Sequence, residues 1–109
     1  PATAPAAPTT AAAGDGREQR KLGAQARQQL AEKTRPLKRE LERINARLAA
    51  LAQERQALED KLTQPLPPAE IAECGRKLKA GADETAGLEE KWLDVSGELE
   101  ALQSAAAEA

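Results

Sequence analysis

Apolar residues recur every seven positions along the first half of the chain. One position of this repeat, d, always holds Leu or Ile, and a second position, a, holds mostly Leu. The d residues are Leu30, Leu37, Ile44, Leu51 and Leu58, and the a residues are Thr34, Leu41, Leu48, Arg55 and Leu62. Because such a repeat makes a narrow apolar stripe along one helix face, it predicts a coiled-coil arm of about four and a half heptads.

A second heptad stretch follows a segment rich in proline, Thr63 to Glu70, which cannot continue a helix because proline lacks an amide donor. Pro67 and Pro68 suit the first turn of a new helix. The a residues are Ile71, Leu78, Thr85, Trp92 and Leu99, and the d residues are Cys74, Gly81, Leu88, Val95 and Leu102. Two arms joined by about five loop residues must run antiparallel, so we expect an all-α, two-helix coiled-coil hairpin.

Charged residues beside the apolar stripe indicate how the two arms align. If Leu41 packs beside Leu88, the g positions of the two arms form four facing pairs of opposite charge. These pairs are Lys33 with Glu98, Glu40 with Lys91, Arg47 with Glu84, and Glu54 with Lys77. A shift of one heptad would bring like charges together, so the charges select the alignment while the leucine stripe supplies the stability.

A proline interrupts the first heptad stretch. Pro36 disfavours helical geometry at Arg35, so we expect a bend or break that separates a short N-terminal helix from the first arm. The expected segments are residues 17–33 and residues 36–63. Trp92 is expected to face Leu37 and cover the break with its ring; a platform for stacking bases is the alternative role for this side chain.

The remaining boundaries follow from composition. Residues 1–16 are a Pro/Ala/Thr tract without a periodic apolar face, which we interpret as a disordered linker. The helical hairpin domain is expected over residues 17–103, with a turn at 64–67, a second arm at 68–103 and a frayed tail at 104–109. Since the chain opens with Pro1 inside a linker, we expect it to be part of a larger protein.

Composition rules out a conventional globular core. The chain has 109 residues, of which 40% are apolar, but it contains no Phe, Tyr or Met and only one Trp. The apolar residues are mostly Ala and Leu, and 31% of all residues are charged. This balance favours long helices that meet along a thin seam.

Catalytic and metal-binding chemistry is not expected. The chain lacks a G-x-x-x-x-G-K-[ST] phosphate loop and has no histidine to act as a base or zinc ligand. We therefore predict no catalytic residues, no metal site and no enzymatic activity. Cys74 is expected to fill a seam position, with redox sensing as the alternative. The absence of an apolar run of about 18 residues and of a signal peptide favours a cytoplasmic protein.

The two arms carry opposite net charge. Residues 16–64 contain 12 basic and 7 acidic residues, whereas residues 65–109 contain 4 basic and 10 acidic residues. The arms therefore attract each other, which favours a hairpin within one chain, and hence a monomer, over pairing of like arms between chains. An intermolecular coiled coil remains the alternative.

Basic residues gather on the first arm. Arg35, Arg39, Arg43 and Arg47 follow one another at steps of four, a spacing at which like charges disfavour a helix. Either this face is only solvated, or it binds phosphates. The candidate nucleic-acid-binding residues are Arg17, Arg20, Lys21, Arg27, Lys33, Arg35, Lys38, Arg39, Arg43 and Arg47. Without interleaved aromatic residues, such a face would contact the nucleic-acid backbone rather than bases, and binding would weaken with salt.

Three segments together resemble a known family. They are "REQRKL" at residues 17–22, "RPLKRELERINARLAALAQERQALEDKL" at 35–62, and "LEEKWLDVSGELEAL" at 88–102 after a proline-bearing turn. Over residues 17–102 the chain is similar to the C-terminal coiled-coil domain of bacterial ABC-F ATPases of the YheS and Uup branches. The most specific features are the basic-Glu-Gln-basic start, the proline within the arm, and the Trp-Leu pair. Family members often carry an aromatic residue near the first motif, and this chain has none there.

The resemblance implies a function for the chain. ABC-F proteins are cytoplasmic, bind and hydrolyse ATP with Mg²⁺ in two cassettes, and act mostly on translating ribosomes. Their C-terminal arm is implicated in contacts with ribosomal RNA, tRNA or DNA. The chain is thus expected to be an accessory nucleic-acid-binding domain without a cofactor of its own. The alternative is a protein-interaction or spacer coiled coil that does not bind nucleic acid.

Overall fold

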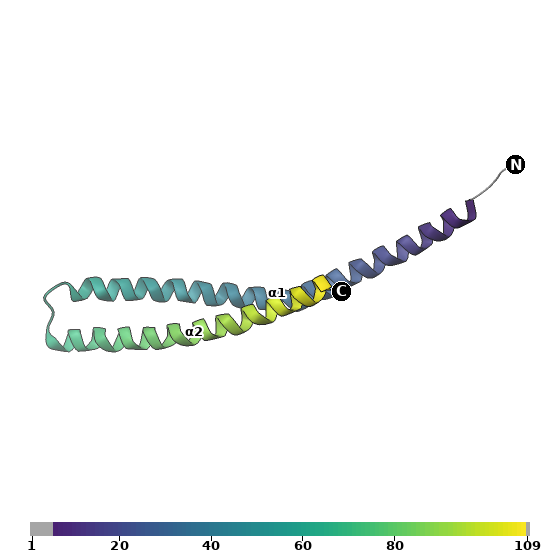
Figure 1. Ribbon diagram of the computed structural model, residues 1–109. Helices are drawn as coiled ribbons and strands as arrows, with labels where there is room; N and C mark the ends of the chain where they lie inside the picture. Colours follow the sequence, from purple (N-terminus) through teal and green to yellow (C-terminus); the bar gives the residue numbers. More distant parts are fainter. Residues whose placement is uncertain (1–5, 109) are drawn as a thin grey trace.

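The computed structural model describes the backbone of residues 6–108 and the side chains of residues 16–108 (Figure 1). Two long antiparallel helices make up this part of the chain: α1 spans Ala6–Leu62 and α2 spans Pro68–Glu108. No strand occurs in the described residues. The molecule measures 102 × 19 × 16 Å. The predicted all-α helical hairpin is confirmed.

A short turn reverses the chain where the prolines predicted it. At the end of α1, the Thr63 amide donates to the Asp60 carbonyl over 3.1 Å and the Gln64 amide donates to the Lys61 carbonyl over 3.2 Å. These bonds tighten the last turn and occupy carbonyl groups that the helix leaves free. At the start of α2, the Pro67 carbonyl accepts the first helical hydrogen bonds, so Pro68 stands in the first turn, where its missing amide costs nothing.

The heptad positions form the seam between the helices. Every buried residue in the part of the chain with described side chains occupies a predicted a or d position. They are Thr34, Ile44, Leu51, Cys74 and Val95, each 3–6% exposed. The buried Thr34 hydroxyl donates to the Ala31 carbonyl of its own helix over 3.4 Å, so its polar group has a partner. The seam is thin, because most other a and d side chains are only half-buried.

The predicted register is confirmed by two ion pairs between the helices. Lys91 Nζ lies 3.2 Å from Glu40 Oε1, and Arg47 binds the Glu84 carboxylate through two nitrogens. The two outer predicted pairs do not form ion pairs among the described residues: Lys33 and Glu98 stay apart, as do Glu54 and Lys77. Glu54 turns instead toward Arg47, with 3.7 Å between Oε1 and Nη1.

The predicted break at Pro36 was wrong. Helix α1 continues through Pro36, so the expected short N-terminal helix and first arm are one element. Pro36 is exposed at a c position, away from the seam, and only one helical hydrogen bond, to the carbonyl of Glu32, is lost. Because the seam residues Thr34 and Leu37 on either side still pack against α2, the helix is maintained across the proline.

Both helices are longer than expected at their outer ends. Helix α1 begins at Ala6, so residues 6–16 are helical where a disordered linker was predicted; residues 1–5 lie outside the described residues. Helix α2 reaches Glu108, so residues 104–108 continue the arm where a frayed tail was predicted. Both segments are rich in alanine, which has the highest helix propensity and lets a helix extend without a packed seam.

Trp92 has neighbours on α1 that the sequence did not predict. Its side chain, 37% exposed, lines a hollow together with Asn45 and Leu48, about two turns further along α1 than Leu37. Side chains of a helix lean toward its N-terminus. In an antiparallel pair this lean carries the ring toward the turn of the hairpin, and therefore toward later residues of α1.

Truncation of the seam should destabilise the hairpin strongly. Leu51 is 5% exposed, so Leu51→Ala should lower the free energy of unfolding by about 2 kcal/mol or more. The matched control is Leu22→Ala, because Leu22 is 64% exposed and should change stability by less than about 0.5 kcal/mol. Urea unfolding followed by circular dichroism measures both. Equal effects of the two substitutions would contradict the described seam.

Replacement of the proline within α1 should stabilise the protein. Pro36→Ala restores an amide donor for the Glu32 carbonyl, and we expect a gain of about 1–3 kcal/mol in the same unfolding experiment. Pro68→Ala serves as the control, since Pro68 lies in a first turn and its replacement should change little. A loss of stability in Pro36→Ala would indicate that the chain needs a break at this point.

Candidate nucleic-acid interface

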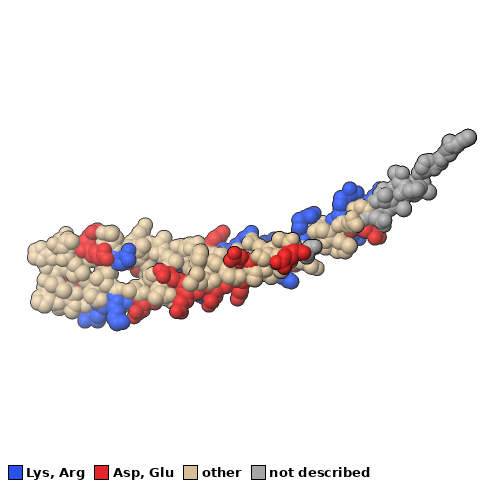
Figure 2. All heavy atoms as spheres, viewed as in Figure 1, with Lys and Arg blue, Asp and Glu red and all other residues tan. Residues whose placement is uncertain are grey.

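All ten predicted phosphate-binding residues lie on α1, and all ten are exposed. Their side chains project from the paired part of α1 and from the part that extends past α2, where Figure 2 shows blue groups on the surface. Exposure alone does not make a cation available to a ligand, because an acidic neighbour within the protein can already occupy it. The ten residues therefore differ in what surrounds them.

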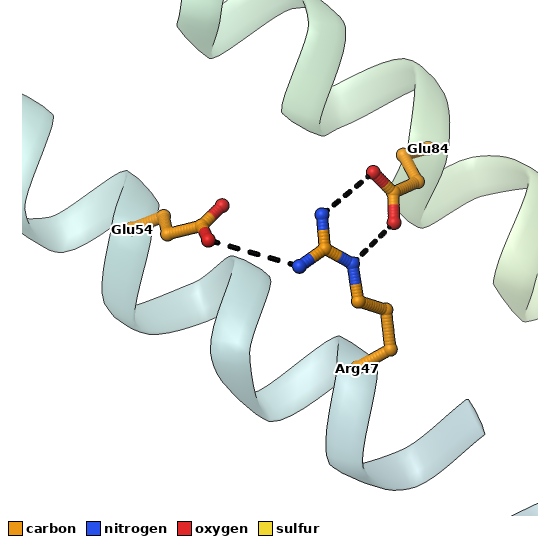
Figure 3. Close-up of polar contacts among 3 residues, drawn as sticks. All are labelled: Arg47, Glu54 and Glu84. Atoms are coloured by element: carbon orange, nitrogen blue, oxygen red, sulfur yellow. Dashed lines mark hydrogen bonds and ion pairs between the residues drawn. The ribbon is translucent and has the colours of Figure 1, made fainter. Parts of the chain in front are cut away.

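Arg47 is committed to contacts within the protein. Its Nε and Nη2 donate to the two carboxylate oxygens of Glu84, with 2.9 Å between Nη2 and Oε1, and Nη1 faces Glu54 (Figure 3). These hydrogen bonds lower the pKa of the Glu84 carboxyl and raise the pKa of the Arg47 guanidinium, because each favours the charged form of its partner. Arg47 thus sets the register of the helices and does not belong with the free cations.

The other nine residues form no ion pair with any residue whose side chain is described. They are Arg17, Arg20, Lys21, Arg27, Lys33, Arg35, Lys38, Arg39 and Arg43. The three arginines at 35, 39 and 43 repel one another along one side of α1, a cost that the fold does not recover through internal pairs. These cations remain available to an external anion.

The length of α1 separates these cations into two groups. The ion pair sets Lys91 opposite Glu40. Helix α2 continues for seventeen residues after Lys91 and ends at Glu108. Because the helices are antiparallel, Glu108 lies opposite the residue seventeen positions before Glu40, which is Gly23. Residues 16–22 therefore extend past α2, as Figure 1 shows for this end of α1. We call residues 16–22 the overhang; it carries Arg17, Arg20 and Lys21 and one acidic residue, Glu18, so its net charge is +2.

The overhang is the part of the basic surface that α2 does not neutralise. Along the hairpin, the α1 cations share the rod with the acidic residues of α2, such as Glu90 and Asp94. Arg27 faces the alanine-rich end of α2, and the overhang has no neighbouring helix. Because fields of opposite charges at short distance cancel, the positive potential should be strongest from the overhang to Arg27.

The sequence contained a signal for the overhang that the heptad analysis did not use. Counted back from Leu30, the a and d positions hold Arg27, Gly23, Arg20 and Gly16 in place of leucine. Charged and glycine residues at these positions cannot build a seam. The apolar repeat of α1 therefore ends at Leu30, about two turns before α2 ends opposite Gly23, and the helix continues as an exposed basic segment.

The described residues form no redox, metal-binding or base-stacking site. Cys74 is buried in the seam, 3% exposed. Among the residues described, no group of three or more Cys, Asp or Glu side chains is arranged to hold a metal ion. Trp92 lines a hollow between the helices together with Glu89, and none of the ten candidate cations lines that hollow. Over the described residues, neither helix contains a stretch both long and apolar enough to cross a membrane.

Comparisons with known proteins add no relatives to this picture. No protein family, curated protein or solved structure matches the chain. What the chain does must therefore be inferred from its own residues and their geometry.

The Arg47–Glu84 contact should make hairpin stability depend on pH in acid. Because the pKa of Glu84 is lowered in the folded protein, the contribution of its charge is complete above the ordinary glutamate pKa of about 4.3 and is lost as the pH falls through the lower, folded value. Glu84→Gln should therefore be less stable than the wild type at pH 7, and this difference should shrink below about pH 4.3. Urea unfolding at a series of pH values tests this. Glu90→Gln, which removes a carboxylate without a described ion pair, is the control; a difference for Glu84→Gln that persists in strong acid would assign its effect to packing.

Proposed function

We propose that the chain is a nucleic-acid-binding accessory domain that contacts the phosphate backbone through the basic surface of α1. The observation that carries this proposal is the set of nine exposed cations without described ion pairs, which continues past the end of α2. Nucleic acids are abundant polyanions, and a linear array of Arg and Lys side chains fits the row of phosphates along their backbone. The array follows one long, continuous helix, so it suits an extended backbone better than a small, enclosed anion.

Recognition should depend on charge and shape and not on base sequence. The chain has a single aromatic residue, Trp92, which lines a hollow between the helices and belongs to α2, whereas the candidate cations all lie on α1. Base stacking on α1 is therefore absent from the proposed mode of binding. Arg and Lys contacts to phosphate position a protein on a nucleic acid without reading its bases.

The parent protein that we propose is an ABC-F ATPase. This part of the proposal is supported by the resemblance of residues 17–102 to ABC-F C-terminal domains. We propose accordingly that the arm contacts ribosomal RNA, tRNA or DNA in the cytoplasm. ATP and Mg²⁺ would then belong to the cassettes of the parent, and this domain would contribute contacts but no catalysis. The coding sequence upstream of Pro1 tests the assignment directly, since it should encode an ATP-binding cassette.

Neutralisation of the overhang should weaken nucleic-acid binding more than neutralisation elsewhere. The variant Arg17→Gln, Arg20→Gln, Lys21→Gln should raise the Kd for duplex DNA and structured RNA about tenfold or more, because it removes the cations that α2 does not neutralise. The variant Arg35→Gln, Arg39→Gln, Arg43→Gln should have a smaller effect of the same sign. Fluorescence anisotropy at low salt measures both, and glutamine keeps the helix propensity.

A matched control is available at the other end of the rod. The variant Arg76→Gln, Lys77→Gln, Lys79→Gln changes the net charge by the same three units on α2, and we expect it to leave Kd within about threefold. If about four phosphates are contacted, wild-type affinity should fall roughly a hundredfold between about 50 and 200 mM salt. No binding at low salt would support a spacer or protein-interaction arm instead. Equal effects of the three variants would show that only total charge matters.

A further inference from the structure

A half-exposed tryptophan lines a hollow between the two helices. Trp92 occupies an a position of α2, yet its side chain is 37% exposed and is not among the buried residues of the seam. The hollow measures about 340 Å³ and is lined by Asn45 and Leu48 of α1 and by Glu89, Trp92 and Leu93 of α2. This volume is at the lower end of the range for small-molecule sites, so the hollow suits one long side chain better than a folded element.

The lining of the hollow combines three kinds of groups. Trp92 offers aromatic surface, Leu48 and Leu93 offer aliphatic surface, and Glu89 and Asn45 offer oxygen atoms that accept hydrogen bonds. The face of an aromatic ring attracts a cation through its quadrupole, and a carboxylate attracts a cation directly. A ligand that matches all three kinds of groups is therefore a cation on an aliphatic stem.

Glu89 has no counter-charge among the residues whose side chains are described. It is exposed, and the register of the ion pairs places it level with Glu42 of α1, a second exposed carboxylate, because the two lie two residues from Lys91 and Glu40 respectively. Lys38 lies one turn before Glu42, and it forms no described ion pair with either carboxylate. The hollow therefore has an uncompensated carboxylate in its lining and another at the same level of the rod.

The surrounding part of α2 also favours a cation. Residues 84–100 contain six acidic residues and one basic residue, Lys91. Lys91 is already paired with Glu40 on the other flank of the seam. Charge complementarity therefore selects a cationic occupant for the hollow, and it disfavours a nucleic acid or the acidic α2 of another copy.

We propose that the hollow binds an arginine side chain of a partner protein. The guanidinium lies on the ring of Trp92 and donates hydrogen bonds to the carboxylate of Glu89, while the aliphatic stem packs on the leucines of the lining. Arginine fits better than lysine, because its guanidinium is planar and weakly hydrated, stacks on aromatic rings and binds a carboxylate through two N–H groups. This interaction is separate from the proposed nucleic-acid contact, since it requires none of the cations of α1.

Peptide titration followed by proton–nitrogen NMR tests the proposal. The probe is a short capped peptide with one arginine between alanines, and the control peptide carries citrulline, the neutral isostere of arginine, at the same place. The side-chain N–H signals of Trp92 and Asn45 report on the hollow without ambiguity, because the chain has one Trp and one Asn. We expect the arginine peptide to shift both signals with a millimolar Kd, and the citrulline peptide to bind at least about fivefold more weakly.

Substitutions distinguish the hollow from the general charge of α2. Glu89→Gln should raise the Kd of the arginine peptide about fivefold or more, because it removes the carboxylate of the lining. Trp92→Leu keeps an apolar residue at the a position and should weaken binding to a similar extent, as read from the Asn45 signal. Glu90→Gln is the matched control: it removes the same charge one residue further along α2, outside the lining, and should leave Kd within about twofold. Circular dichroism confirms that each variant is still helical.

Each contrary result overturns a separate part of the proposal. Signals that do not move up to about 20 mM arginine peptide would show that the hollow is not a binding site. Equal binding of the citrulline peptide would show that the charge of arginine is not recognised. Equal weakening by Glu89→Gln and Glu90→Gln would assign binding to the net charge of α2 instead of the hollow. Shifts of the two signals with protein concentration, in the absence of peptide, would assign the hollow to a second copy of the chain.

Discussion

A thin apolar seam between two antiparallel helices is the constraint on which the rest of this structure depends. The chain has almost no large side chains, so the seam consists mainly of Leu, Ile and Val with Thr34 and Cys74, and only five described residues are buried. Such a seam can hold two helices together but cannot enclose a cleft. Binding must therefore take place on the outside of the rod, through charge and through the flanks of the seam.

Electrostatics act on this rod at two ranges. At short range, Glu40 with Lys91 and Arg47 with Glu84 fix the register on one flank. At longer range, the basic α1 and the acidic α2 attract each other and largely cancel where they lie together. The positive charge of the overhang is not cancelled, because α1 extends past the end of α2. The same chain therefore has a nearly neutral rod and a positive end. The proposed nucleic-acid contact uses that difference.

The thinness of the seam also leaves apolar surface uncovered. Where Gly81 stands opposite Leu48, no side chain fills the space between the helices, and a groove results. Beside it, Leu93 and Trp92 of α2 line a second hollow and stay partly exposed. The ion pairs between the helices lie on the other flank of the seam.

The sequence by itself determined the two arms, the turn, the seam and the register, because each depends on a local or strictly periodic pattern of residue types. The heptads identified the buried residues, and the charges at Glu40, Arg47, Glu84 and Lys91 identified the alignment. The tertiary structure decided that α1 continues through Pro36, since seam contacts on both sides outweigh one lost hydrogen bond. It also decided where Trp92 packs and that Arg47 is paired while its basic neighbours are free. These outcomes depend on how far side chains reach across to the other helix, which spacing along one chain does not specify.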